Sequence, residues 1–150
     1  EKKTLNGDTA MATLTAQLTG SISLDGRNVD CGAAAMNFTV SKRDERNVLV
    51  GTAAFQKILD VDDVLNGDFQ YLSIENLDSA NYVDLSFVAD SATNHFSLQL
   101  AAGKSIVLPY SQFNSSAASA TPSVVSHYIA EVHAQAHGAA VKLRIIAFNT

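Results

Sequence analysis

The sequence predicts an all-β protein: a single antiparallel β-sandwich of eight to nine strands, with either jelly-roll or immunoglobulin-like topology. Apolar and polar residues alternate strictly along residues 14–24, where Leu14, Leu18 and Ile22 share one side. The same alternation returns at 71–76, 83–89, 96–100 and 141–147. A period of two gives a strand with one buried and one wet face. Several such runs separated by turn signals are typical of sandwiches and barrels.

We expect residues 1–10 to form a flexible N-terminal arm and residues 11–150 to form one sandwich domain. The length of 150 residues is enough for one core without staples, and no shift of composition marks a boundary.

In the first half, strands are expected at 12–24, 36–40 and 48–59. The Asp25-Gly26 pair favours a hairpin turn after the first strand, and Gly51 is a candidate break in the third. Charged residues crowd 41–47, which we interpret as a loop. Residues 60–68 are interpreted as an acidic turn.

In the second half, strands are expected at 69–76, 82–89, 95–100, 104–108, 124–136 and 140–148. Turns separate them at 77–81, 90–94, 101–103 and Gly138. Residues 110–123 are uncharged and rich in Ser and Ala, which predicts a long loop. The Ala content of 129–137 leaves a helix as the alternative there, but the β-branched start of 124–136 favours a strand.

Composition excludes some classes of partner. The net charge is −5, so clustered cations for nucleic acid are not expected. Hydrophobic residues make up 47% and charged residues only 17%, below the usual value of about 25%. Either part of the surface meets other protein, or Ser, Thr, Asn and Gln solvate it. No run approaches the roughly 18 apolar residues of a membrane helix.

Charge is unevenly placed along the chain. Residues 58–103 contain eight acids and no Lys or Arg. From residue 91 onward, Glu131 is the one acid, against Lys104, Lys142 and Arg144. This asymmetry suits either an acidic patch of one copy facing a basic patch of another, or a solvated acidic face. Cys31 is the single cysteine, which excludes an intrachain disulfide and favours assembly in a reducing cytoplasm.

The histidines are the first candidates for chemistry. His133 and His137 have the H-x3-H spacing of a helical metal pair, with His127 nearby. The zinc-protease motif needs Glu after the first His, where this chain has Ala134. On a strand the two imidazoles would lie about 13 Å apart, too far for one ion. We therefore expect no metal site. The alternative is three interface histidines that make assembly sensitive to pH.

Other motifs fail on spacing. An EF-hand loop that starts at Asp60 or at Asp62 would not have its acids, Gly and Glu at the required positions. An irregular calcium site is therefore the remaining alternative to an acidic turn at 60–68. Gly103-Lys104-Ser105 ends like a P-loop, but Leu98 occupies the position of the first Gly. No nucleophile elbow or complete catalytic set is present. We expect no enzyme activity and no cofactor.

One stretch supports a resemblance. Residues 69–110 contain Phe69 to Asn76, then Asp78, then Asn81-Tyr82-Val83, and later Ala102-Gly103-Lys104 and a strand closed by Pro109. This succession resembles small β-sandwich structural proteins of tailed-bacteriophage virions. Many of those proteins have an acid where this chain has Lys104. The resemblance implies a virion component such as a head decoration (cement) protein, and it carries no catalytic residues.

We therefore expect a non-enzymatic structural virion protein that self-associates as a trimer or dimer and contacts major capsid or other virion subunits. It would be assembled in the host cytoplasm. Contact segments would be the arm and the long loop, with Leu5, Tyr110, Phe113 and Lys104 as interface candidates. The alternative is a carbohydrate- or receptor-binding β-sandwich module of tail or fibre type, with Tyr110 or Phe113 at its site.

Overall fold

The predicted all-β class is confirmed over the part of the chain that the structure describes. The computed structural model describes residues 11–17, 19, 21–24, 27–30, 32, 34–40, 42–60, 69–89, 95–109, 112–116 and 124–149. These residues form strands, turns and irregular segments without a helix, and every strand pair is antiparallel. The chain divides into two compact units, Glu1–Ser41 and Lys42–Thr150. This boundary falls inside the range 11–150 that we expected to be one domain.

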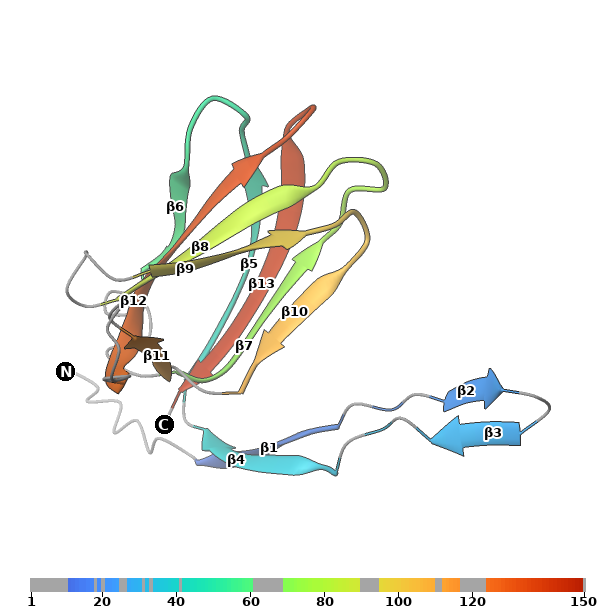
Figure 1. Ribbon diagram of the computed structural model, residues 1–150. Coiled ribbons are helices and arrows are strands. Elements are labelled where there is room, and N and C mark those ends of the chain that lie inside the picture. The colour runs from blue at the N-terminus through green and yellow to red at the C-terminus, as the bar shows by residue number, and fades with distance from the viewer. Residues whose placement is uncertain are drawn as a thin grey trace, which may run out of the picture. The chain divides into compact units, whose positions relative to one another are not determined.

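The first unit consists of two short two-stranded ribbons (Figure 1). Strand β1 (Ala12–Ala16) pairs with β4 (Met36–Val40), and β2 (Ser21–Leu24) pairs with β3 (Arg27–Asp30). Leu24 lies opposite Arg27, so the predicted hairpin is confirmed. Residues 12–24 were expected to form one strand. They instead contribute β1 and β2, which pair with different partners.

The β1–β4 ribbon is amphipathic. Leu14 lies opposite Phe38 and Ala16 opposite Met36, so that these side chains share one face. The other face is polar and exposed, and consists of Thr13, Thr15, Asn37 and Thr39. The ribbon buries little: among the residues of this unit whose side chains are described, Val40 is the one buried hydrophobic residue.

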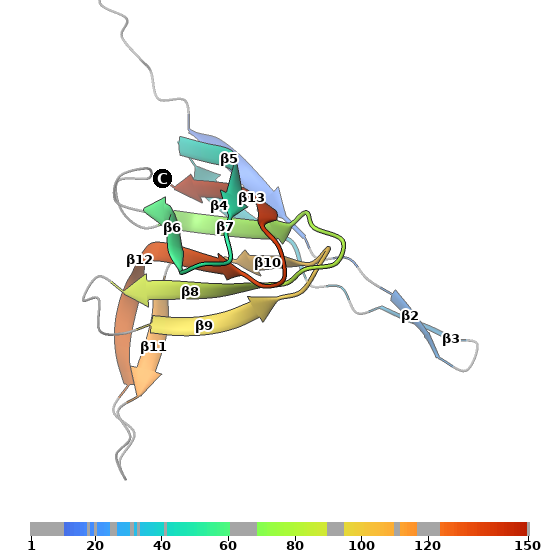
Figure 2. The ribbon, with the colours of Figure 1, turned by 90° about the horizontal axis from the view of Figure 1, so that it is seen from above.

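The second unit contains two antiparallel sheets. Its strands are β5 (Lys42–Val50), β6 (Gln56–Asp60), β7 (Phe69–Asn76), β8 (Val83–Ala89), β9 (His95–Leu100), β10 (Ser105–Leu108), β11 (Gln112–Ser116), β12 (Val124–Ala136) and β13 (Val141–Asn149). One sheet has the order β10-β7-β13-β5. The other has the order β11-β12-β8-β9, with β6 also paired to β12. Figure 2, which looks from above, shows them as two layers.

Both sheets contribute to one hydrophobic core. The buried side chains alternate along the strands, as the period of two predicts, most regularly in β8 and β13. The largest fully buried ones come from both sheets and include Phe69, Phe87, Leu85, Leu143 and Ile145. Phe87 also stacks on Phe96 of β9, with ring centroids 4.6 Å apart. The arrangement is sandwich-like.

The predicted loop at 41–47 is wrong, because residues 42–47 lie within strand β5. Opposite charges two positions apart fall on the same side of a strand. Arg43 pairs with Glu45 on the outer side, while Arg46 pairs with Asp44 at 2.7 Å on the other. Arg46 and Asp44 lie opposite residues of β13 that face the core, so their side chains point inward at the sheet margin.

The predicted long loop at 110–123 is also corrected, since β11 lies inside it. Strand β12 is thirteen residues long, while β8 pairs with it only from Ile129 onward. The first five residues of β12 therefore need other backbone partners, which Gln112–Ser116 supply. The helix alternative for 129–137 is wrong, because β12 continues as a strand to Ala136.

Most other boundaries agree with the sequence. Strands at 36–40, 69–76, 95–100 and 124–136 are confirmed as β4, β7, β9 and β12. The break after Val50 is confirmed as well, since Gly51 begins the connection to β6. The described residues form thirteen strands, more than the eight to nine expected. The arm at 1–10 and most of the acidic turn at 60–68 lie outside the described residues.

Candidate interaction surfaces

Four connections meet at one end of the second unit, and we call this region the loop end. They are residues 51–55, 77–82, 101–104 and 137–140, each of which joins two consecutive described strands. Backbone hydrogen bonds tie them together: Asn76 N to Lys104 O (2.9 Å), Leu77 N to Lys142 O (3.0 Å), Ala136 N to Gly51 O (3.0 Å) and His137 N to Tyr82 O (3.1 Å). The loop end is therefore built as one piece, although connections are usually the more mobile parts of a fold.

Asn76 organises this end from within. Its side chain is buried, and its Nδ2 donates to the carbonyl oxygens of Asn81 (2.9 Å), Leu100 (3.2 Å) and Ala101 (3.2 Å). Its Oδ1 accepts from the backbone N–H of Asp78 at 2.9 Å. One amide thus joins the connections after β7 and β9. A buried amide with all of these partners satisfies its own hydrogen-bonding needs.

Asp78 shapes the same connection. Its Oδ1 accepts from the backbone N–H of Asn81 (2.6 Å) and of Ala80 (2.8 Å), and from the Asn81 side chain at 3.2 Å. The backbone N–H groups of Asn81 and Ala80 hold the pKa of Asp78 below its usual value. Gly138 has a φ of 87°, and an added Cβ would lie 2.4 Å from Asn81 Oδ1. The Asn-x-Asp and Asn-Tyr motifs of the sequence therefore have a structural role here.

The loop end also exposes large apolar side chains. Phe55 is 47% exposed, Leu77 is 44% exposed and Tyr82 is 37% exposed. The Tyr82 ring stacks on His137, with centroids 4.6 Å apart and an angle of 15°. His137 Nε2 lies 2.7 Å from Asp84 Oδ2, so the stacked pair is anchored to β8.

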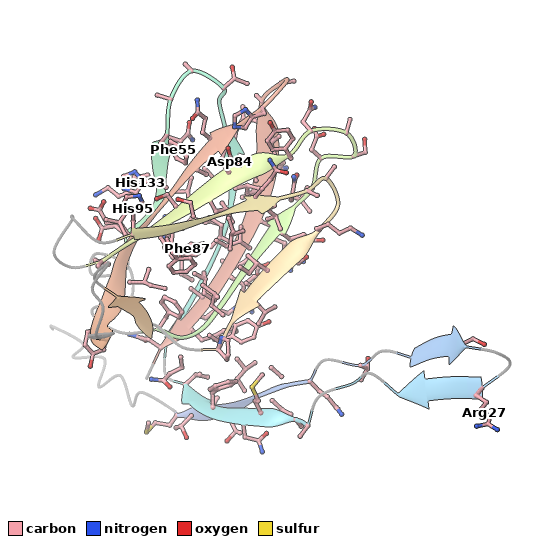
Figure 3. The ribbon with its side chains drawn as sticks, viewed as in Figure 1. Arg27, Phe55, Asp84, Phe87, His95 and His133 are labelled. Carbon is pink, nitrogen blue, oxygen red and sulfur yellow. The ribbon has the colours of Figure 1, made fainter. Side chains whose placement is uncertain are left out.

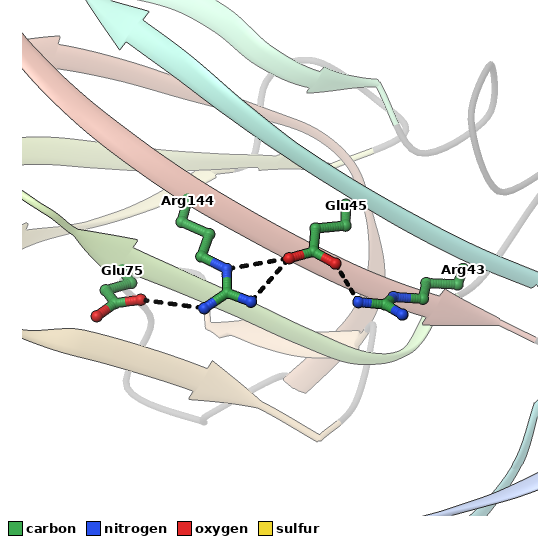
Figure 4. A network of polar contacts seen from close by, with 4 residues as sticks. All are labelled: Arg43, Glu45, Glu75 and Arg144. Carbon is green, nitrogen blue, oxygen red and sulfur yellow. Dashed lines mark hydrogen bonds and ion pairs between the residues drawn. The ribbon is translucent and has the colours of Figure 1, made fainter.

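The outer face of the β10-β7-β13-β5 sheet carries a line of alternating charges (Figure 4). Arg144 reaches Glu45 on β5 at 2.7 Å and Glu75 on β7 at 4.0 Å, and Glu45 also pairs with Arg43. The hydrogen bond from Arg144 is the main reason that the pKa of Glu45 is lowered. Beside this line, Tyr71 packs edge-on against Phe148, with centroids 6.0 Å apart. Ion pairs in such exposed positions add little stability.

The outer face of the other sheet carries a second network, of which His133 is labelled in Figure 3. Lys57 Nζ lies 2.8 Å from both Asp60 Oδ2 and Glu131 Oε1. Glu131 Oε2 lies 2.7 Å from His133 Nε2. The hydrogen bond from Lys57 and then that from His133 lower the pKa of Glu131, while the two carboxylates raise the pKa of Lys57. The network links β6 to β12.

The structure describes two of the four interface candidates that the sequence suggested. Lys104 is exposed at the loop end, just before β10. Phe113 lies in β11, opposite His127 of β12, and the description of these two residues stops at the backbone. Tyr110 and Leu5 lie outside the described residues. His133 and His137 belong to separate networks, with Glu131 and with Asp84.

Sequence reasoning missed the exposed apolar residues of the second unit. Leu49 is 67% exposed and Val107 is 45% exposed, besides Phe55, Leu77 and Tyr82 at the loop end. For Leu49 a signal was available, because Val48 and Val50 leave it on the opposite side of the same strand. Leu77 directly follows β7 and Phe55 directly precedes β6, so both lie outside the strands, where alternation no longer applies.

No group of three or more His, Cys, Asp or Glu residues able to hold a metal ion occurs among the described residues. Within the same residues, no helix has the length and apolar character to cross a membrane. Comparisons of the chain with protein-family models, with curated proteins and with solved structures gave no match.

Proposed function

We propose that this protein is a non-enzymatic structural component of a virus particle, a decoration or cement protein that acts by burying surface against its neighbours. The observation that carries the proposal is the first unit. Its described strands form two-stranded ribbons, and such ribbons are marginally stable in water on their own. Leu14, Met36 and Phe38 line one face and are partly buried. A neighbouring subunit that covered this face would stabilise the ribbon and be bound by it.

The strand order of the second unit supports the same role, and we propose that this unit is a jelly roll. Eight of its strands pair as a rolled-up hairpin would: β5 with β13, β6 with β12, β7 with β10, and β8 with β9. Strand β11 is an addition at the start of β12. Jelly rolls build viral capsid domains as well as lectin domains. The resemblance of residues 69–110 to tailed-phage sandwich proteins favours the capsid role.

The proposal has further parts. The protein self-associates, as a trimer or dimer, and contacts major capsid or other virion subunits. Repetition over a symmetric shell then strengthens individually modest contacts. Mass spectrometry of intact particles purified from the source tests the location directly. The chain should be present in a fixed copy number, and its absence from pure particles would refute the virion role.

Ribbon variants test the mechanism. Leu14→Asp places a charge on the apolar face of the β1–β4 ribbon and should weaken binding to purified shells by about tenfold or more. Thr13→Asp adds the same charge on the polar face and should leave binding within about twofold. Equal binding of the two variants would exclude the apolar face as the contact. Thermal melting of both variants checks that the second unit still folds.

The second candidate is a glycan- or receptor-binding module. The outer face of the β9-β8-β12 sheet favours it, because it presents hydroxyl, amide, carboxylate and imidazole groups in neighbouring rows. The groups belong to Ser97, Ser86, His133, Gln99, Asp84 and Gln135. A glycan array screened with the whole protein tests this role. Hits that disappear in Asp84→Asn would favour it over the structural role.

A further inference from the structure

We infer that the loop end of one copy binds the acidic connection 61–68 of a second copy, so that copies associate head to tail. This inference rests on the self-association in the proposed function and names the surfaces that produce it. The docking surface is composed of Leu49, Lys142 and Leu77, with Lys104 beside them.

Three of these residues form a row across neighbouring strands. Leu49 of β5 lies directly opposite Lys142 of β13. Leu77 continues the row, because its backbone N–H donates to the Lys142 carbonyl at 3.0 Å. Leu49 is 67% exposed and Leu77 is 44% exposed. Two leucines therefore flank a lysine on a backbone held in place by the hydrogen bonds of the loop end. Rigid support of this kind lowers the ordering cost of binding.

The cations of this surface have no internal partner among the described residues. Elsewhere in the second unit, Arg43, Arg46, Lys57 and Arg144 each form an ion pair with a carboxylate. Lys104 and Lys142 form none with the described acids. Asp78 lies close in sequence to this surface, but its Oδ1 already accepts three hydrogen bonds from Ala80 and Asn81.

The complementary charge lies in the connection between β6 and β7. Its sequence contains Asp62, Asp63 and Asp68 without a cation, together with Val61, Val64 and Leu65. Acidic and apolar side chains in one short segment match a surface of lysines flanked by leucines. Opposite charges steer association and set its orientation, while the apolar contacts add to its strength.

Position makes the contact one between copies. The connection joins Asp60 to Phe69, and Phe69 lies opposite Asn149, the last residue of β13. Lys142 is near the other end of β13, about 23 Å away at about 3.3 Å per residue. The described end of the connection at Phe69 therefore lies far from Lys142, and for this reason we infer a contact between copies. A contact that repeats head to tail closes into a ring when the rotation permits. Of the trimer and the dimer that we propose, such a ring favours the trimer.

Charge reversal tests the inference on the full-length chain. Sedimentation equilibrium in low salt measures the association constant of the wild type, of Lys142→Glu and of Asp62→Lys/Asp63→Lys. We expect each variant to associate at least about tenfold more weakly, and the variant with all three substitutions to recover to within about threefold of the wild type. The matched control is Thr19→Glu/Ser23→Glu, which changes the net charge as much as Lys142→Glu does, on exposed positions of the first unit. It should associate like the wild type.

The outcomes separate the inference from the proposed function. If the wild type associates and Lys142→Glu associates equally well, the head-to-tail contact is wrong while self-association stands. A triple variant weaker than both parents would also overturn it. A wild type that is monomeric at micromolar concentration would refute both the head-to-tail contact and the proposed self-association. Association should weaken in about 1 M salt, where the screening length falls to about 3 Å.

Discussion

Replacing Asn76 by aspartate exchanges one buried atom, a nitrogen that donates for an oxygen that accepts. In the wild type this nitrogen faces the carbonyl oxygens of Asn81, Leu100 and Ala101 at 2.9 to 3.2 Å. A carboxylate in the same place would point negative charge at three acceptors, with 1% of the residue exposed to water. The substitution is nearly isosteric, so the change of hydrogen bonding and charge dominates its effect.

The magnitude follows from the lost contacts. Each net hydrogen bond contributes about 0.5–1.5 kcal/mol, and each buried group left without a partner costs about 1–3 kcal/mol. The Leu100 carbonyl contact is fully buried, whereas those of Asn81 and Ala101 are partly buried and water can replace them. We expect Asn76→Ala to lower the free energy of unfolding by about 3 kcal/mol. Asn76→Asp should lower it further at neutral pH, because the carboxylate is also charged.

The assay is urea unfolding followed by circular dichroism, for both variants and for Asn47→Asp as a control. Asn47 is exposed on β5, so the same chemical change there should alter stability by less than about 0.5 kcal/mol. Asn76→Asp should recover part of its stability towards acid pH, where the protonated carboxyl can again donate. A loss below about 1 kcal/mol for Asn76→Asp, or no dependence on pH relative to Asn76→Ala, would refute the role of this amide.

Two further predictions concern the same end of the molecule. Gly138→Ala should lower the free energy of unfolding by about 2–4 kcal/mol, because Gly138 has a positive φ and the added Cβ would meet Asn81. Gly103 also has a positive φ but open space around it, so Gly103→Ala should lose only about 1 kcal/mol. Thermal melting compares the two variants, and equal losses would contradict the steric explanation. Asp78 has a lowered pKa in the folded state, so its stabilisation is fully present above its usual value near 3.8 and is lost as the pH falls through the folded value. Asp78→Asn should therefore flatten the fall of stability in acid, and unchanged acid sensitivity of this variant would show that the carboxylate hydrogen bonds do not matter.

The sequence was sufficient to predict the fold class, because alternating apolar and polar residues follow directly from the burial of one face of each strand. Residues 83–89 alternate in the sequence and alternate between buried and half-buried in β8. The prediction from the sequence failed at 42–47, where the charged residues suggested a loop. The missing information was the partner: Glu45 is balanced by Arg144, which is 99 positions away. Pairing between distant strands is not encoded in a local pattern.

The surfaces were harder to predict than the core. Lys104 was singled out from the sequence and is exposed, but Lys142 and Leu49 were placed beside the loop end by the register of β5 and β13 alone. The Asn76, Asp78 and Asn81 set was visible as a motif. The role of this set could not be predicted without knowing that the ends of β7 and β9 adjoin, because Asn76 donates to carbonyl oxygens at both ends.

The inward pair of Asp44 and Arg46 on β5 affects how copies of the protein can associate through their sheet edges at high local concentration. Strand β5 is the last of its sheet and offers nine residues of backbone to any additional strand. A strand from another molecule that docked there would bring its own side chains against this carboxylate and guanidinium and strip them of water. Burying those charges without fresh partners is costly. The β5 edge is thus protected against uncontrolled growth into fibrils, a common hazard of open β structures.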